Sequence, residues 1–203
     1  VLDDGGFPST MNAVQVDTLL GRAYRQWDTA QFFGYIERFG IDKEKAIKDY
    51  SKGMKTKMVI AAALSHHAEL LLLDEPTSGL DPVVRDEVLD LLYDFMQDDT
   101  HAILLSSHIT SDLDKIADEI TFIHRGEVLL SEPRDELLDT CGVLHCTADQ
   151  LDALDPSVVR AKRVGAFGCE ALVRRGGVPE NWPVEPVSIE QMMLFLTRGE
   201  RAE

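Results

Sequence analysis

The sequence has few cysteines, few basic residues and no long apolar run. Three cysteines in 203 residues are too few for a disulfide framework, which indicates a reducing compartment. The longest apolar run, residues 58–64, falls well short of the ~18 residues that a membrane-spanning helix needs. Lys and Arg number 20 against 36 Asp and Glu, and this net charge of −16 disfavours a surface that binds nucleic acid or anionic lipid by charge.

The cysteines and one histidine lie close enough in sequence to raise the question of a metal site. The residues concerned are Cys141, His145, Cys146 and Cys169. Their spacing matches no common zinc pattern, so free thiols are the simpler interpretation.

What is present is typical of a globular α/β protein. Apolar residues make up 44% and charged residues 28% of the chain, and the length suits one large domain with at most a small appendage. Residues 70–73 are four leucines that end at Asp74, and residues 102–107 form a second apolar run that ends at His108. Helical patterns alternate with these strands, which predicts a largely parallel sheet.

The flanking segments have different patterns. Helices are expected between Val16 and Asp49, where Phe32, Tyr35, Ile36 and Phe39 share one face and are expected to be core rather than docking surface. Ser51 is a candidate N-cap for the helix that follows. Near the C-terminus, residues 142–186 are short apolar pieces cut by Gly and Pro, and a last helix is predicted over residues 188–198.

Two adjacent carboxylates follow the four leucines directly. Ligands of open α/β sheets bind beyond the carboxyl ends of the strands, where Asp74 and Glu75 are expected to lie. One carboxylate there can hold Mg²⁺ beside a nucleotide's phosphates while its neighbour orients an attacking water. Taken by itself, the pair is more simply interpreted as an acidic surface turn, because Asp-Glu pairs are common in an acidic protein.

The longer pattern is more specific. Residues 70–82 read Leu-Leu-Leu-Leu-Asp-Glu-Pro-Thr-Ser-Gly-Leu-Asp-Pro, which resembles the Walker B motif and D-loop of ATP-binding cassette (ABC) ATPases at every position. The Ser-Ser-His at residues 106–108 resembles the H-loop of that family. This resemblance implies that Glu75 polarises the attacking water, that Asp74 is the metal residue and that His108 contacts the γ-phosphate. It also implies a D-loop in which Asp81 couples two sites across an interface; its residues are Ser78, Gly79, Leu80 and Asp81.

The family's signature sequence, Leu-Ser-Gly-Gly-Gln, has a partial counterpart one helix earlier. Ser51 and Gly53 match it, whereas Lys52 and Met54 are departures that are similar to the form in a subgroup of bacterial exporters. A Ser hydroxyl, a Gly N–H and a helix N-terminus suit phosphate oxygens, and the charge of Lys52 is compatible with that. The resemblance implies that these four residues bind nucleotide held by a twin subunit; a plain N-capped helix is the alternative.

The phosphate loop of the family is missing from the sequence. No Gly-x-x-x-x-Gly-Lys-Ser/Thr occurs in the 203 residues, and the opening segment resembles the loop after the Q-loop strand, with Asp3 nearest the usual Gln. We therefore expect the sequence to be the C-terminal piece of a longer subunit, unless the segment was left out of the sequence. The piece is expected to bind ATP poorly and to hydrolyse it negligibly.

The resemblance implies a fold and a division into parts. The fold class is α/β, an incomplete parallel sheet core of the P-loop NTPase type, with a helical subdomain and a small α+β appendage. Residues 1–140 would be the C-terminal part of the ATPase domain, with the helical subdomain at about 16–67 and the catalytic core at about 68–140. Residues 141–203 would be the appendage.

The implied function is that of an ATP-hydrolysing subunit of a bacterial ABC exporter, with ATP and Mg²⁺ as cofactors. Its partners would be a transmembrane permease subunit and a second nucleotide-binding subunit, in a homodimer or heterodimer, with no nucleic acid. The subunit would be cytoplasmic and peripheral on the inner face of the membrane.

Two other readings keep the same motifs. The first is a soluble ABC-type ATPase that acts on nucleic acid or the ribosome, which the single set of motifs and the net charge of −16 disfavour. The second is a non-catalytic regulatory cassette, which the presence of both Glu75 and His108 disfavours.

Overall fold

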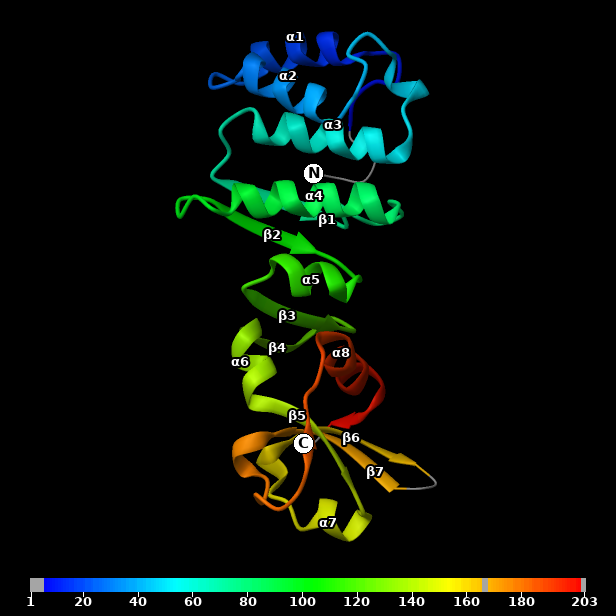
Figure 1. Cartoon of the computed structure of the whole chain (residues 1–203), viewed down its shortest axis with the longest axis vertical. Helices are drawn as coiled ribbons and strands as arrows, with labels where there is room; N and C mark the ends of the chain where they lie inside the picture. The colour runs from blue at the N-terminus through cyan, green and yellow to red at the C-terminus, as the bar shows by residue number, and fades with distance from the viewer. Residues whose placement is uncertain (1–5, 166–167, 202–203) are drawn as a thin grey trace. The chain divides into compact units, whose positions relative to one another are not determined.

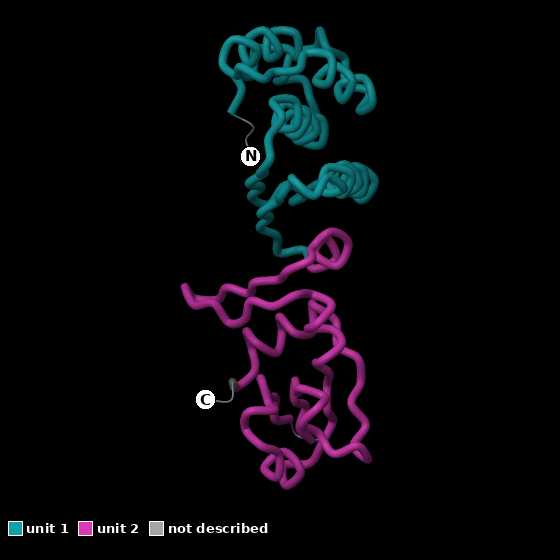
Figure 2. The backbone as a smooth tube through the Cα atoms, turned by 90° about the vertical axis from the view of Figure 1, so that its left-hand side faces the viewer, with its two compact units in different colours: residues 1–109 teal, residues 110–203 magenta. Residues whose placement is uncertain are grey.

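The computed structural model describes residues 6–165 and 168–201, so the Q-loop-like Asp3 lies outside the described residues. The chain divides into two compact units, residues 1–109 and 110–203 (Figure 2), and each is described by itself. Among the described residues, no helix combines the length and the apolar character needed to cross a bilayer.

The first unit contains helices and one pair of strands (Figure 1). Its elements are α1 (Ala13–Ala23), α2 (Thr29–Arg38), a 3₁₀ turn η1 (Ile47–Asp49), α3 (Lys52–Leu64), β1 (Leu70–Asp74), α4 (Pro82–Phe95) and β2 (Ala102–Ser106). The predicted helices begin where the sequence offers a cap, since the side chains of Asn12, Asp28, Ser51 and Asp81 each accept a backbone N–H at the start of a helix. Pro82 occupies the first position of α4, where its missing N–H costs no hydrogen bond because the first N–H groups of a helix have no partner within it.

The aromatic residues of α2 are core, as their spacing predicts. Phe32 and Ile36 are buried between α1, α2 and α3, and Tyr35 and Phe39 pack against the same cluster. Lys57 on α3 is also buried; its Nζ pairs with Glu87 of α4 and lies 5.4 Å from the ring centroid of Phe39. This cation therefore joins the helical segment to α4.

Strands β1 and β2 run parallel and in register, with Leu72 opposite Leu104 and Asp74 opposite Ser106. One face of this pair is covered, since Leu71 and Leu73 are buried. The opposite face is apolar, and its Leu70, Leu72 and Leu104 are 55%, 56% and 67% exposed. Because side chains alternate along a strand, Asp74 and Ser106 stand at the end of this same face.

The second unit is mainly antiparallel. It contains α5 (Thr110–Ile116), the hairpin of β3 (Glu119–His124) and β4 (Glu127–Pro133), α6 (Arg134–Thr140), β5 (Cys141–Cys146), α7 (Ala148–Asp152), η2 (Pro156–Val158), β6 (Val159–Gly165), β7 (Gly168–Arg174), η3 (Arg175–Gly177), β8 (Val184–Glu185), α8 (Ile189–Arg198) and β9 (Glu200–Arg201). Among the described residues, parallel pairing is confined to β1 and β2 of the first unit. The hairpin turns at Arg125 and Gly126, whose φ angles of 51° and 83° suit a tight primed turn.

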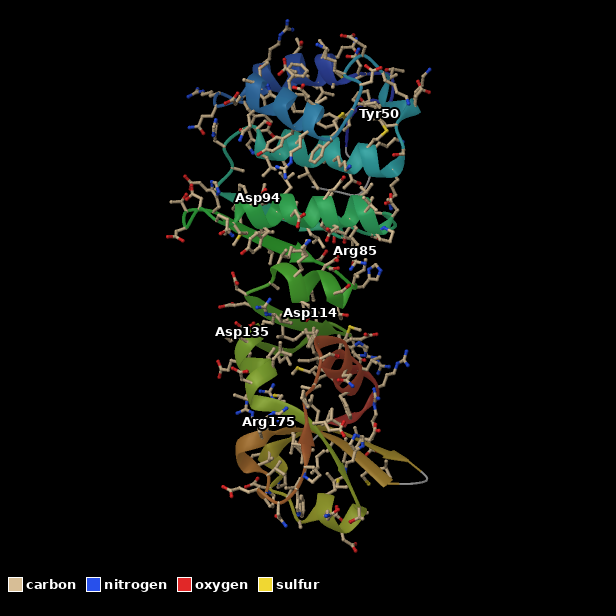
Figure 3. The ribbon with its side chains drawn as sticks, viewed as in Figure 1. Tyr50, Arg85, Asp94, Asp114, Asp135 and Arg175 are labelled. Atoms are coloured by element: carbon tan, nitrogen blue, oxygen red, sulfur yellow. The ribbon has the colours of Figure 1, made fainter. Side chains whose placement is uncertain are left out.

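A five-stranded sheet in the order β8-β5-β7-β6-β9 forms most of this unit, together with the predicted last helix, α8. The predicted boundary at residue 140 remains a prediction; the compact unit begins at Thr110, because Ile120, Leu130 and Leu137 share one core with Leu172 and Met192. Arg175, labelled in Figure 3, donates to the carbonyl oxygens of Cys141, Val184 and Glu185 and so joins β5 to β8.

Candidate active site

The carboxyl ends of β1 and β2 bring the predicted catalytic residues together. Asp74 is the last residue of β1, Ser106 is the last residue of β2, and Ser106 Oγ donates a hydrogen bond to Asp74 Oδ1 at 2.5 Å. The backbone N–H of Glu75 donates to Ser106 Oγ at 3.0 Å and to the Ser106 carbonyl at 3.1 Å. One serine therefore holds both acidic residues at the end of the sheet.

Glu75 and His108 are in direct contact. Glu75 leaves the strand in a left-handed conformation, with a φ of 46°, which is uncommon for a residue other than Gly and turns its side chain out of the strand path. Its Oε2 lies 2.7 Å from His108 Nδ1, and the two side chains are 33% and 68% exposed. Both side chains are therefore partly accessible to a bound molecule, although the contacting oxygen, Glu75 Oε2, is itself buried.

The D-loop residues form a compact turn after the strand. The N–H of Ser78 donates to the Glu75 carbonyl, and the N–H of Leu80 donates to the Thr77 carbonyl. Gly79 has a φ of 68°, a conformation that favours glycine. Asp81 caps α4, since its Oδ1 accepts the N–H groups of Val83 and Val84 at 3.1 Å each. Asp81 thus has a structural role besides the coupling role that its position in the motif predicts.

The signature-like residues open α3 as predicted. Ser51 Oγ accepts the N–H of Met54 at 3.2 Å, and the Ser51 side chain is exposed at the start of the helix. The preceding residue, Tyr50, labelled in Figure 3, is buried, and its hydroxyl donates to the Asp42 carbonyl at 3.1 Å. Burial and the nearby Asp42 carboxylate raise the pKa of Tyr50, so it stays neutral and anchors the turn before Ser51.

Lys52 and Gly53 tie this helix start to the D-loop and to α4. A Cβ on Gly79 would lie 3.0 Å from Lys52 Nζ, and a Cβ on Gly53 would lie 2.9 Å from Val84 Cγ1. The start of α3, the D-loop and the start of α4 are therefore adjacent (Figure 1). The contact of Lys52 with the D-loop could not be predicted from the sequence, because the spacing between the two segments does not indicate that they pack together.

The residues at the sheet end suit a metal that a nucleotide also holds. Within residues 6–165 and 168–201, no three His, Cys, Asp or Glu side chains converge to enclose a metal ion. Mg²⁺ is often bound by one or two carboxylates, water and substrate phosphates, and the exposed Asp74 beside the Ser106 hydroxyl fits that arrangement. The three cysteines, Cys141, Cys146 and Cys169, are buried and form no disulfide with one another.

Solved structures define the class of this fold. A dimeric ATP-binding cassette in a post-hydrolysis state with ADP and phosphate bound is 19% identical and aligns with a TM-score of 0.56, over 66% of this chain and 61% of that one. At this identity the similarity shows the fold, and it confirms the predicted α/β class of the P-loop NTPase type.

The sequence comparisons give the family. A family profile described as "AAA domain, putative AbiEii toxin, Type IV TA system" matches residues 8–113, more than half of the 203 residues, and the chain belongs to this family. Among curated proteins, the chain is 39% identical over 104 residues to the bacitracin transport ATP-binding protein of Bacillus licheniformis, covering 50% of the chain and 34% of that protein. It is 40% identical over 95 residues to the lantibiotic transport ATP-binding protein of Streptococcus pyogenes, covering 47% of the chain and 41% of that protein.

These relatives confirm the resemblance to ABC transporter ATP-binding proteins that the motifs indicated. The matched part of the chain spans 34% and 41% of the lengths of these two relatives.

Proposed function

We propose that this chain is the part of an ATP-hydrolysing subunit of a bacterial ABC exporter that carries the signature and Walker B residues. The observation that carries the proposal is the 2.7 Å contact between Glu75 Oε2 and His108 Nδ1 beside Asp74, at the carboxyl ends of two parallel strands. A carboxylate and an imidazole at that place are the groups that water activation and recognition of a terminal phosphate require.

Each acidic residue and the histidine have a separate task in this proposal. Glu75 orients the attacking water and accepts its proton. His108 donates a hydrogen bond to the terminal phosphate, and its contact with Glu75 fixes both side chains. Asp74, held by Ser106, would hold Mg²⁺ through its water shell. Bound Mg²⁺ would supply charge neutralisation on the phosphates.

The signature residues act on a nucleotide held by a second subunit. Ser51 caps α3, and Gly53 and Met54 lie in its first turn, where the positive end of the helix dipole favours phosphate oxygens. Lys52 adds a cation next to Gly79, so a phosphate at the start of α3 also contacts a residue packed on the D-loop. ATP held between two subunits would close the dimer, and loss of the terminal phosphate would open it.

The proposed partners are a second nucleotide-binding subunit and a transmembrane permease, which places the subunit on the inner face of the cell membrane. The names of the bacitracin and lantibiotic relatives support transport as the work that hydrolysis drives. Co-purification tests this: a hydrophobic partner in detergent supports it, whereas association with ribosomes or DNA supports the soluble alternative.

The test of the site is Glu75→Gln in the subunit that carries this sequence together with a phosphate loop. Turnover of ATP should fall by about 10²-fold or more, because the amide cannot accept the proton, while ATP is retained in a dimer visible by size exclusion. Glu69→Gln is the matched control, since Glu69 is exposed just before the opposite end of β1. Unchanged turnover in Glu75→Gln contradicts the proposed role. If the isolated 203-residue chain hydrolyses ATP rapidly, the proposal that the site also needs a phosphate loop outside this sequence is contradicted.

A further inference from the structure

Two of the three cysteines face each other across the sheet of the second unit. Cys146 ends β5, Cys169 lies near the start of β7, and the two are register partners in the antiparallel ladder. Both are buried, at 9% and 5% exposure, and both belong to the same apolar cluster with Leu144 and Ala171. Their side chains therefore point to the same face of the sheet.

The backbone geometry suits a disulfide at this pair. Directly opposite residues of antiparallel strands have Cα atoms about 4.5–5.5 Å apart, within the ~4.4–6.8 Å that disulfides span. Their Cβ atoms lie about 4.5–5.5 Å apart, so closure asks for a shift of about 1 Å. Cys141 has no such partner, because the residue opposite it is Arg174.

We propose that Cys146 and Cys169 are a redox-active pair that closes to a cross-strand disulfide when a peroxide oxidises the protein. One thiolate attacks a peroxide oxygen, the O–O bond breaks and a sulfenic acid and water form. The second thiol attacks that sulfur, the S–O bond breaks and a second water leaves. Two thiols and one hydrogen peroxide thus give one disulfide and two waters; the sulfurs lose two electrons and the peroxide gains them.

The position of the pair in the ladder gives a small oxidant access to buried thiols. The rung of Cys146 and Cys169 is the last of the β5–β7 ladder, and strand ends open more readily than strand centres. Val164, the partner of Cys169 on β6, is exposed, so solvent reaches this end of the sheet. Cys141 lies at the opposite end of β5 and is fully buried.

The reaction should accelerate with rising pH. Burial, and then the neighbouring Cys169, raise the pKa of the Cys146 thiol above its usual range. The thiolate is the attacking form, so raising the pH increases its fraction, and the raised pKa keeps the pair slow to react near neutral pH. The same burial favours a disulfide that forms under sustained oxidant rather than at trace levels.

The experiment treats the full chain with hydrogen peroxide and maps tryptic peptides without reduction. Residues 135–160 hold Cys141 and Cys146 in one tryptic peptide, and residues 164–174 hold Cys169 in another. A joined species, lighter than the sum of the two peptides by the two hydrogens lost, should appear in the wild type and vanish on reduction. Because that species does not distinguish Cys141 from Cys146, the variant Cys141→Ser is the decisive sample: it should retain the link.

The variants Cys146→Ser and Cys169→Ser should each abolish the link. Oxidised wild type and oxidised Cys141→Ser should also melt several degrees above their reduced forms, since the bond closes a loop between β5 and β7. The wild-type map requires no substitution, so it decides the question even if a serine variant fails to fold. A link that disappears in Cys141→Ser, a bond between two chains, or three thiols that persist under peroxide overturns the proposal.

Discussion

Ser106 donates to Asp74 across the ends of two parallel strands, at 2.5 Å from oxygen to oxygen. The same hydroxyl accepts the N–H of Glu75 at 3.0 Å, so its single O–H donor and one of its two lone pairs bind two consecutive acidic residues. The relationship depends on strand register, because Ser106 is the β2 residue directly opposite Asp74. The hydroxyl is therefore a positioning group for the candidate site.

Ser106→Ala should lower both stability and activity. Loss of the two bonds should cost about 1–2 kcal/mol in the free energy of unfolding, measured by denaturant titration. In a subunit with a phosphate loop, ATP turnover should fall about 10–100-fold, because the orientation of Asp74 and Glu75 is no longer fixed. Ser107→Ala is the control, since the Ser107 hydroxyl bonds within its own loop: it accepts the N–H of Ile109 at 3.0 Å and donates to the Ile109 carbonyl at 3.4 Å. Equal effects of the two variants on turnover would contradict the positioning role.

Gly53→Ala should destabilise the chain through packing rather than through nucleotide binding. The new Cβ would lie 2.9 Å from Val84 Cγ1, so α3 and α4 must move apart, at a cost of about 1–3 kcal/mol. The double variant Gly53→Ala with Val84→Ala removes the clash, and thermal melting should show it more stable than the sum of the two single changes predicts. If the stability changes of the two single variants simply add up in the double variant, Gly53 is not needed for the close approach of α3 to α4.

Gly79→Ala should be costlier than the same change at a glycine with open surroundings. Gly79 and Gly40 have φ angles of 68° and 63°, but a Cβ on Gly40 would meet nothing within 4 Å, whereas one on Gly79 would meet Lys52 Nζ at 3.0 Å. The loss of stability in Gly40→Ala thus measures the backbone strain alone, about 1 kcal/mol. Any additional loss in Gly79→Ala measures the cost of displacing the Lys52 side chain. Adding Lys52→Ala to Gly79→Ala should remove that excess in denaturant titration; an excess that persists points to another cause.

Lys57→Met should destabilise the first unit by about 1–2 kcal/mol, measured by chemical denaturation. The variant keeps the length of the buried side chain and removes the charge that pairs with Glu87 and faces Phe39. The cost stays moderate because the Glu87 side chain is 49% exposed and regains water. Lys55→Met, at an exposed position two residues earlier on α3, should change stability little. A loss at Lys55 equal to that at Lys57 would argue against the ion pair as the cause.

Sequence patterns predicted the local features of the fold well, because each depends on neighbouring residues. The cap at Ser51, the core face of α2 and the strand that ends at Asp74 all follow from spacing within one element. The order of motifs also located Glu75 and His108, whose contact the structure then showed.

Features that depend on the pairing of distant segments were not predictable from one sequence. The role of Ser106 comes from the register of β2 against β1, and the contact of Lys52 with Gly79 comes from how α3 packs on the D-loop. The pairing of Cys146 with Cys169 likewise depends on strand register, and it could not be predicted from the spacing of the cysteines in the sequence. The β3–β4 hairpin and the C-terminal sheet share one core that includes residues on both sides of residue 140. This packing also depends on contacts between distant segments, so the sequence did not predict it.

The exposed leucines on the same face as Asp74 connect the docking of another polypeptide with the binding of a metal ion at Asp74. Whatever polypeptide shields Leu72 and Leu104 from water must also dehydrate the carboxylate that ends the same face. A carboxylate in a drier setting attracts a cation more strongly, because the local dielectric constant falls. The affinity of Asp74 for a divalent ion should therefore increase when a polypeptide docks onto those leucines. By linkage, the bound ion should in turn strengthen the docking.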